Sequence, residues 1–333
     1  MSQISIAING FGRIGRSLTR VLLREKNVKV VAINEPNISI EYISYLLAHD
    51  SIYYERKYVS KIVDGNIAIG DDYIIKIFHE KECYKECWED VNPDYIIDTT
   101  GSIKTLDDAE KHIVKSVKKV ILTNTGEQIQ QVVVGVNGKE IENGNKILSS
   151  STCITCAIAP LLKDVDEFVG IEKVIATSIH SATNEQNVVD GFLIEDWAAG
   201  RSAMGNIIAS PTFAAKSIST ILPQLSDKVY FTEYRVPTNI VSLLDIMIST
   251  NKKTTITKLF QYISQNNRGE ILKLVDGPCV SSDFIGNDST AIVDMDSSYM
   301  VDENTFKLTI WYDNEWGYVM AVKRLIFLLQ NEM

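Results

Sequence analysis

The sequence contains no run of about 18 consecutive apolar residues, so it predicts no membrane-spanning helix. Cysteine is scarce, and an odd number of cysteines, five, is not typical of a secreted disulfide framework. Basic residues are outnumbered by acidic ones, 33 against 43, and the net charge of −10 disfavours nonspecific binding to nucleic acid or to an anionic membrane surface. The opening MSQISIAING lacks the basic start and long apolar stretch of a signal peptide, so we expect a cytoplasmic protein.

The length of 333 residues exceeds what one ordinary hydrophobic core holds, so two domains are expected. In the first half, short apolar runs alternate with helical patterns. Strands are predicted at 4–9, 28–34, 95–100, 119–124 and 131–136. Helices are predicted at 16–25 and 105–117. This alternation is typical of a parallel sheet that helices cover on both faces.

The pattern changes after the cysteine-containing segment 149–160, where longer strands have few helices between them. These strands are predicted at 173–179, 228–236, 241–248 and 305–312. They indicate an α+β domain with a mainly antiparallel sheet. The C-terminal segment 314–333 carries apolar residues at helical spacing, which predicts a final helix.

A glycine-rich turn, G-x-G-x-x-G, is formed by Gly10, Gly12 and Gly15 directly after the first predicted strand. The glycines permit a tight turn, close approach of a diphosphate to the backbone and close packing of helix on strand. The helix that follows offers unpaired N–H groups to the diphosphate. Glu35 ends the second strand, where a carboxylate accepts hydrogen bonds from ribose hydroxyls and repels a 2′-phosphate. We therefore predict an α/β fold with a Rossmann-type domain that binds NAD rather than NADP; a turn that serves only packing is the alternative.

Cys153 and Cys156 lie three residues apart in SSSTCITCAIAP, where a helix is predicted to end near Leu162. A redox pair and a metal site are two interpretations. However, the segment lies in mid-chain between two different domains, and it has no second cysteine pair nearby. Cys83 and Cys87 are four residues apart in a charged segment and are expected to face outward.

A single nucleophilic thiol is the third interpretation. Residues 149–152 supply capping side chains, which places Cys153 in the first turn of the helix. The helix dipole and backbone N–H groups stabilise a thiolate there, so a lowered thiol pKa is predicted. Cys156 is then a buried neighbour. Such a thiol needs a base, and His180, at the end of a predicted strand, is the best candidate among the four histidines.

Six motifs recur in one order over nearly the whole chain. They are INGFGRIGR (8–16), SSSTCITCAIAP (149–160), IHSATNEQNVVDG (179–191), RVPTNIVSLLDI (235–246), VSSDF (280–284) and WYDNEWGY (311–318). In these motifs the sequence resembles the glyceraldehyde-3-phosphate dehydrogenases and the closely similar erythrose-4-phosphate dehydrogenases, with INEP, GDDYIIKIFHE and IHSA leaning slightly toward the latter. The resemblance implies NAD as the cofactor, an NAD-binding domain of residues 1–152 and 317–333, a catalytic domain of residues 153–316, and a homotetramer.

The resemblance also implies a reaction on a small aldehyde sugar phosphate. Cys153 adds to the carbonyl, His180 assists deprotonation, NAD takes the hydride, and inorganic phosphate or water attacks the resulting thioester. The matching cofactor-binding positions are Gly10, Gly12, Arg13, Ile14, Gly15, Glu35, Thr123 and Asn314. The matching substrate- and phosphate-binding positions are Thr152, Thr183, Arg201, Thr212 and Arg235. No metal site is implied.

Four positions depart from the family's pattern. Ile154 and Glu185 stand where the family has phosphate-binding threonines, Phe213 replaces a glycine, and Glu195 falls at a basic position. An added carboxylate beside a phosphate dianion costs on the order of a few kcal/mol at a partly buried site. We therefore expect intact oxidation chemistry and altered phosphate sites.

The altered positions leave three functions open beside glyceraldehyde-3-phosphate oxidation. One is erythrose-4-phosphate oxidation with water as acyl acceptor. A second is oxidation of an unphosphorylated or amine-bearing aldehyde. The third, from another class, is a non-catalytic protein that binds NAD or senses thiol oxidation through Cys153 and Cys156.

Overall fold

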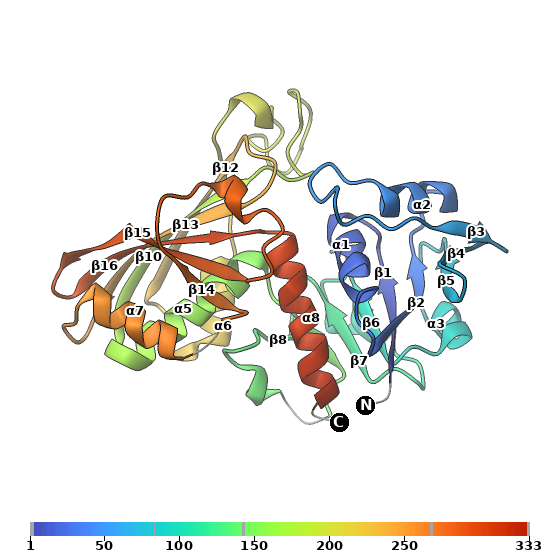
Figure 1. Cartoon of the computed structure of the whole chain (residues 1–333), viewed down its shortest axis with the longest axis horizontal. Helices are drawn as coiled ribbons and strands as arrows, with labels where there is room; N and C mark the ends of the chain where they lie inside the picture. The colour runs from blue at the N-terminus through green and yellow to red at the C-terminus, as the bar shows by residue number, and fades with distance from the viewer. Residues whose placement is uncertain (1–2, 83, 142–143, 267–268, 332–333) are drawn as a thin grey trace. The chain divides into compact units, whose positions relative to one another are not determined.

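The computed structural model describes residues 3–82, 84–141, 144–266 and 269–331 (Figure 1). The chain divides into two compact units. The first unit comprises Met1–Val134, Gly138–Thr152 and Val322–Met333. The second comprises Gly135–Asn137 and Cys153–Ala321. Among the described residues, no helix has the length and apolarity needed to cross a lipid bilayer.

The first unit is built on a nine-stranded sheet with the order β3-β4-β5-β2-β1-β6-β7-β9-β8. Its strands are β1 (Ile4–Asn9), β2 (Val28–Asn34), β3 (Lys61–Val63), β4 (Asn66–Ile69), β5 (Tyr73–Phe78), β6 (Tyr95–Asp98), β7 (Lys119–Leu122), β8 (Gln130–Gln131) and β9 (Ile147–Ser149). All neighbours from β5 to β8 run parallel, and β3 and β4 extend the β5 edge as antiparallel strands. The winding direction reverses between β1 and β6, which is the switch point where doubly wound sheets bind dinucleotides.

Helices flank this sheet. They are α1 (Arg13–Leu22), α2 (Ile40–Ala48), α3 (Lys85–Val91), α4 (Leu106–Glu110) and the 3₁₀ turn η1 (Gly138–Glu140). The last helix, α8 (Trp316–Asn331), contains the boundary between the units, after Ala321. The central strands β1, β6 and β7 are buried along almost their whole length, as expected of strands covered on both faces. The predicted parallel sheet is therefore confirmed.

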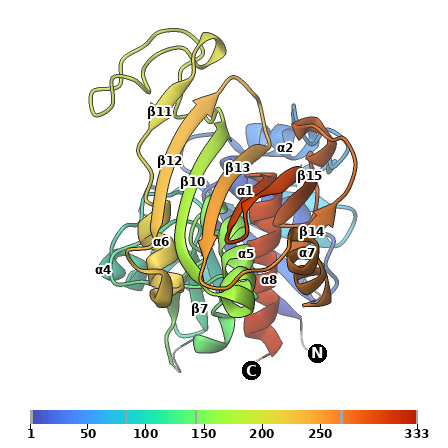
Figure 2. The same cartoon turned by 90° about the vertical axis from the view of Figure 1, so that its left-hand side faces the viewer.

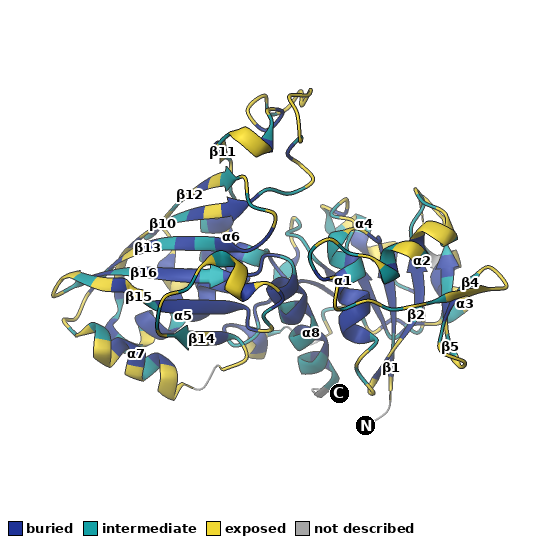
Figure 3. Ribbon diagram, turned by 45° about the horizontal axis from the view of Figure 1, so that its top comes forward, coloured by how far each residue is buried: buried dark blue, intermediate teal, exposed yellow. Residues whose placement is uncertain are grey.

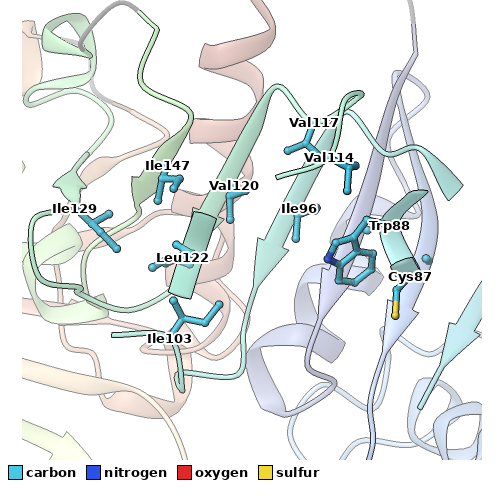
Figure 4. Close-up of a cluster of buried hydrophobic side chains, with 13 residues drawn as sticks. Cys87, Trp88, Ile96, Ile103, Val114, Val117, Val120, Leu122, Ile129 and Ile147 are labelled. Atoms are coloured by element: carbon cyan, nitrogen blue, oxygen red, sulfur yellow. The ribbon is translucent and has the colours of Figure 1, made fainter. Parts of the chain in front are cut away.

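One face of this sheet carries a hydrophobic cluster that involves α3 and α4 (Figure 4). Trp88 is fully buried in it, and its indole N–H donates to His112 Nδ1 at 2.9 Å. Cys87 also belongs to the cluster and is only 8% exposed. The prediction that Cys87 faces outward is therefore wrong, because the helix turns Cys87 and Trp88 toward the sheet. Cys83 lies outside the described residues.

Two predicted elements of the first unit are much shorter than expected. The helix predicted at 105–117 ends at Glu110, because the chain then turns so that Val114 and Val117 enter the hydrophobic cluster. The strand predicted at 131–136 is reduced to β8, which ends at Gln131, and Val132 and Val133 are buried beyond its end. In both places buried apolar residues lie on irregular chain, which periodicity alone does not distinguish from a helix or strand.

The second unit is built on a seven-stranded sheet with the order β11-β12-β10-β13-β16-β15-β14. Its strands are β10 (Ile171–Ser181), β11 (Ile208–Ser210), β12 (Val229–Val236), β13 (Ser242–Thr250), β14 (Leu272–Val275), β15 (Ala291–Asp302) and β16 (Thr305–Tyr312). The β10–β12 and β14–β15 pairs are parallel and the other four pairs are antiparallel, which confirms the predicted mainly antiparallel sheet. The α+β fold class is thereby confirmed as well.

The helical segments of the second unit are α5 (Cys153–Val169), α6 (Ala214–Ile221), α7 (Ile256–Gln265), η2 (Ala203–Gly205), η3 (Pro223–Leu225) and η4 (Ser281–Phe284). The helix that begins at Cys153 extends to Val169, beyond the predicted end at Leu162, and it accommodates Pro160 in its interior. Figure 2 shows β12, β10 and β13 side by side. Their outward side chains include large exposed apolar groups, namely Ile175, Ile179, Tyr230, Tyr234 and Met247. One face of this sheet is therefore largely apolar and exposed.

A long loop, residues 182–207, connects β10 to β11 and is coloured mostly as exposed in Figure 3. It carries several apolar side chains in water, including Phe192, Ile194 and Trp197, which are 101%, 89% and 84% exposed. Exposed apolar groups of this size are typical of surfaces that bind a partner.

Candidate active site

Cys153 is the first residue of α5, as predicted, and follows a tightly held turn. Ser151 has φ +60°, a left-handed conformation that is uncommon for a residue other than glycine. Its backbone N–H donates to Ser149 Oγ at 2.9 Å, and its hydroxyl donates to Gln131 Oε1 at 2.8 Å. The turn thus fixes where the helix begins, and with it the Cys153 side chain.

The thiol of Cys153 lies beside His180, with Sγ 3.7 Å from Nε2. His180 comes from β10 and is only 3% exposed. Its other ring nitrogen, Nδ1, lies 2.8 Å from the backbone carbonyl oxygen of Ser181. With the proton on Nδ1, the ring donates to that carbonyl and Nε2 is an acceptor for the thiol proton; with the proton on Nε2, Nδ1 instead accepts from Arg235 Nη1 at 3.0 Å. We call Cys153 and His180 the thiol–imidazole pair.

The electrostatics of this pair differ from the prediction. Burial raises the pKa of the Cys153 thiol to about 12, although Arg235 and the backbone N–H groups of Ile154 and Cys153 act in the opposite direction. Burial and Arg235 together lower the pKa of His180 to about 3. The predicted lowering of the thiol pKa is therefore wrong, because desolvation outweighs the helix start. At neutral pH the pair consists of a neutral thiol and a neutral imidazole.

Cys156 lies one helical turn further along α5 and is 2% exposed. No disulfide joins Cys153 and Cys156, both of which the structure describes. The interpretation of Cys156 as a buried neighbour is thus confirmed.

Arg235 and Glu233 lie beside the thiol–imidazole pair on β12. In the parallel register with β10, Arg235 is opposite His180 and Glu233 is opposite Ser178. Arg235 Nη1 lies 3.0 Å from His180 Nδ1, and Arg235 Nη2 lies 2.9 Å from Glu233 Oε1. Thr212 lies beside the same carboxylate and acts to lower its pKa. We call Arg235, Glu233 and Thr212 the anion subsite.

Asn314 is buried close to the end of β10. Its Oδ1 accepts hydrogen bonds from the hydroxyls of Ser181 and Ser242, each at 2.9 Å. Because the oxygen is used in this way, the amide NH₂ is the end of the side chain left for another ligand. Tyr312 closes the same region, with its ring centroid 6.0 Å from that of His180.

Other predicted substrate positions lie elsewhere in the second unit or make internal contacts. Arg201, in the loop 182–207, forms an ion pair with Asp190 at 3.0 Å, and both side chains are more than 60% exposed. The Thr183 hydroxyl donates to Gln186 Oε1 at 3.1 Å. Glu185 and Glu195 are exposed. Within the described residues no hydrogen bond or ion pair links Arg201 to Cys153, so the assignment of Arg201 to the substrate site stays a prediction.

The glycine turn of the first unit has the stereochemistry that the motif predicts. Gly10 has φ +95°, and a Cβ on Gly15 would lie 2.2 Å from Gly10 O. A Cβ on Gly12 would meet nothing within 4 Å. The turn therefore needs glycine at two positions for its own geometry, and at the third it leaves bare backbone at the start of α1, which fits a diphosphate.

Glu35 and Thr123 lie at the C-terminal ends of parallel strands of the same sheet. Glu35 Oε2 accepts from Phe11 N at 3.0 Å, and its Oε1 accepts from Asn37. About four lone-pair sites exist on a carboxylate, so this partly exposed group retains room for a ribose hydroxyl. Thr123 donates to Asp98 O, and Arg13 pairs with Asp50 at 2.7 Å. Thr152 and Ile14 are partly exposed.

Comparison with known proteins agrees with these geometries. Residues 152–314 match the family model "Glyceraldehyde 3-phosphate dehydrogenase, C-terminal domain", and residues 4–106 match "Glyceraldehyde 3-phosphate dehydrogenase, NAD binding domain". The chain belongs to the glyceraldehyde-3-phosphate dehydrogenase family. The predicted family and the predicted cofactor, NAD, are both confirmed, and the chain is an NAD-dependent dehydrogenase.

Family members that resemble the chain come from fungi and plants. A glyceraldehyde-3-phosphate dehydrogenase of Eremothecium gossypii is 40% identical over 97% of this chain and 98% of its own length. Glyceraldehyde-3-phosphate dehydrogenase 2 of Saccharomyces cerevisiae is 38% identical with the same coverage. The cytosolic enzyme of Sinapis alba is 35% identical over 97% of each chain.

Sequence reasoning missed Glu233, Tyr312, Ser181 and Ser242. Glu233 lies two residues before Arg235, a spacing that places both side chains on one face of a strand. This spacing was a usable signal. The two serines and Tyr312 gave none, because only the pairing of β10 with β13 and β13 with β16 brings them together.

Proposed function

We propose that this enzyme oxidises glyceraldehyde-3-phosphate with NAD through a thiohemiacetal and then a thioester on Cys153. The observation that carries the proposal is the 3.7 Å separation of Cys153 Sγ and His180 Nε2 at the first residue of α5. The choice of aldehyde is supported by the names of the relatives in Eremothecium gossypii and Saccharomyces cerevisiae.

In the first step, Cys153 Sγ forms a bond to the aldehyde carbon while its proton passes to His180 Nε2. The carbonyl π electrons move to oxygen, which then receives the proton from the imidazolium and becomes the thiohemiacetal hydroxyl. Because both groups are neutral beforehand, proton transfer accompanies addition. The Ser181 carbonyl at Nδ1 stabilises the imidazolium that forms in between.

In the second step, His180 Nε2 takes the hydroxyl proton as the carbon is oxidised. When bound, NAD supplies the hydride acceptor for this step. Asn314 would hold the carboxamide of the nicotinamide through its amide NH₂, and the turn at Gly10, Gly12 and Gly15 would hold the diphosphate with Arg13 and Ile14. Glu35 and Thr123 complete the proposed cofactor contacts.

The thioester is then attacked by inorganic phosphate, which gives an acyl phosphate, or by water, which gives an acid. Thr152, Thr183, Arg201, Thr212 and Arg235 are the proposed contacts of substrate and phosphate. Arg235 and Thr212 have the strongest structural support, since both lie in the anion subsite beside the thiol–imidazole pair.

We also propose a cytoplasmic homotetramer with an NAD-binding domain of residues 1–152 and 317–333 and a catalytic domain of residues 153–316. The exposed apolar face of the second sheet and the exposed Phe192, Ile194 and Trp197 support association with further copies. The cytosolic names of the Sinapis alba and Dianthus caryophyllus relatives support the location.

The test is NADH production from glyceraldehyde-3-phosphate, with and without inorganic phosphate. We expect the wild type to produce NADH. Cys153→Ser should abolish NADH production while NAD still binds, whereas Cys156→Ser should retain NADH production. Unchanged turnover without phosphate would identify water as the acyl acceptor. Faster turnover with erythrose-4-phosphate or with an unphosphorylated aldehyde would contradict the proposed substrate. Absence of NADH production with all of these aldehydes would overturn the enzymatic proposal.

A further inference from the structure

The anion subsite contains its own anion. Glu233 and Arg235 are two residues apart on β12, so their side chains leave the same face of the sheet. Arg235 Nη2 lies 2.9 Å from Glu233 Oε1, and Thr212 lies beside the same carboxylate. Two of the residues that the resemblance assigns to substrate and phosphate, Arg235 and Thr212, therefore both lie beside one carboxylate.

This contact is buried but incomplete. The Glu233 side chain is 3% exposed and that of Arg235 is 13% exposed. The ion pair lacks hydrogen-bond geometry: although Arg235 Nη2 lies 2.9 Å from Glu233 Oε1, that oxygen and Arg235 Nε are, among the described side chains, buried polar atoms without a hydrogen-bond partner. Buried polar atoms are nearly always hydrogen-bonded, so Arg235 Nε–H lacks an acceptor, which a phosphate oxygen would supply, and Glu233 Oε1 lacks a hydrogen, which a proton on the carboxyl group would supply.

The charges around Glu233 come from several elements. Arg235 is the cation on its own strand, and Glu185, in the exposed loop after β10, adds a second negative charge. Cys153 of α5 and Tyr312 of β16 also face Glu233, and both have raised pKa values, so they are neutral at pH 7. His180 is neutral as well, because its pKa is lowered. A phosphate dianion would thus meet one guanidinium and two carboxylates.

A protonated carboxyl would change that balance. The neutral acid releases Arg235 from its ion pair and gains an O–H that can donate to a phosphate oxygen. Burial raises the pKa of Glu233, with Glu185 acting in the same direction, while Arg235 and Thr212 oppose them.

We propose that Glu233 is a specificity-determining residue, and that a phosphate group binds to Arg235 and Thr212 only as one proton from solvent binds to the Glu233 carboxylate. This inference rests on the proposed function, in which a phosphate group of the aldehyde or inorganic phosphate enters this subsite. It makes affinity for phosphate dependent on pH, with tighter binding at lower pH.

Sulfate is the first probe, because it does not titrate between pH 6 and 8. Calorimetry in buffers of different ionisation enthalpy should show uptake of about one proton, and the Kd for sulfate should rise about tenfold per pH unit over this range. In Glu233→Gln, proton uptake should disappear and the Kd should become independent of pH, at least tenfold lower than in the wild type at pH 8.

Two control variants test whether the effect is specific to the Glu233 carboxylate. Glu303→Gln removes an exposed carboxylate paired with Lys253 in the turn between β15 and β16, so its binding curve should match the wild type. Glu185→Gln should tighten binding slightly and retain the pH slope. Loss of the slope in Glu185→Gln, equal affinity in Glu233→Gln and the wild type, or absence of proton uptake in the wild type would each overturn the proposal.

The source of the phosphate group is identified by kinetics. KM for inorganic phosphate and KM for glyceraldehyde-3-phosphate are compared in the wild type and Glu233→Gln at pH 6.5 and 8.5. If the KM for inorganic phosphate falls in Glu233→Gln at pH 8.5, inorganic phosphate occupies the subsite. If the KM for glyceraldehyde-3-phosphate falls instead, the phosphate group of the aldehyde occupies it. If the proposed function is wrong, these assays will show no turnover. Sulfate binding would still test the role of Glu233, because it does not depend on turnover.

Discussion

The dinucleotide turn of the first unit presents backbone groups to a ligand, whereas the anion subsite of the second unit presents side chains. The turn at residues 10–15 offers backbone, and its glycines are required because a Cβ on Gly15 would lie 2.2 Å from Gly10 O. The anion subsite offers side chains from β12 and from the segment before α6, which the pairing of β11 with β12 brings together. Backbone sites need short, fixed motifs, whereas side-chain sites depend on register between strands that are far apart in sequence.

The thiol–imidazole pair falls between these two cases, because a motif marks Cys153 but only the sheet delivers His180. Among the variants considered in this comparison, loss of the His180 imidazole should have the largest effect on turnover. We expect His180→Asn to lower kcat by about 10² to 10⁴-fold, since Nε2 is the proton acceptor in both steps. Steady-state rates and a pH profile measure this. His49→Asn, at an exposed position after α2, is the control. A loss of less than about tenfold would remove His180 from the mechanism.

The pH dependence of thiol reactivity tests whether burial or the helix start controls Cys153. Since burial raises its pKa to about 12, the thiolate fraction should grow about tenfold per pH unit, or about a hundredfold from pH 7 to 9. Alkylation rates followed by peptide mass spectrometry measure this, with Cys156→Ser excluding the neighbour. A plateau below pH 8 would instead support the lowered pKa that the sequence predicts.

The glycine turn offers a matched pair of variants in the first unit. Gly15→Ala should lower the free energy of unfolding by about 1–3 kcal/mol, because the new methyl group collides with backbone. Gly12→Ala should change it by less than about 0.5 kcal/mol, since its methyl group meets nothing, but should weaken NAD binding. Thermal unfolding and NAD titration measure the two quantities. Equal effects of both variants on stability would break the distinction between packing and binding glycines.

The smallest effect is expected for Arg201. Its side chain is exposed and paired with Asp190, so as a proposed phosphate contact it should contribute little, and Arg201→Ala should raise KM for the aldehyde by about two- to fivefold. Steady-state assays beside Arg235→Lys, which should raise KM substantially, check this contrast. An unchanged KM in Arg201→Ala would remove Arg201 from the proposed contacts of substrate and phosphate.

The sequence by itself determined the α/β class, the glycine turn, the position of Cys153 at a helix start and the family. These features depend on local periodicity and on residues close together in the chain. It failed at residues 105–117 and 131–136, where buried apolar side chains lie on irregular backbone, and at Cys87, where the local charge pattern concealed a buried face.

Tertiary structure alone decided the electrostatics of the second unit. The parallel pairing of β10 with β12 sets Arg235 opposite His180, and Glu233, opposite Ser178, lies beside Arg235. Burial then reverses the expected pKa shift of Cys153 and leaves Glu233 in contact with Arg235. Desolvation and charge coupling depend on distances between segments remote in sequence, so no local motif contains them.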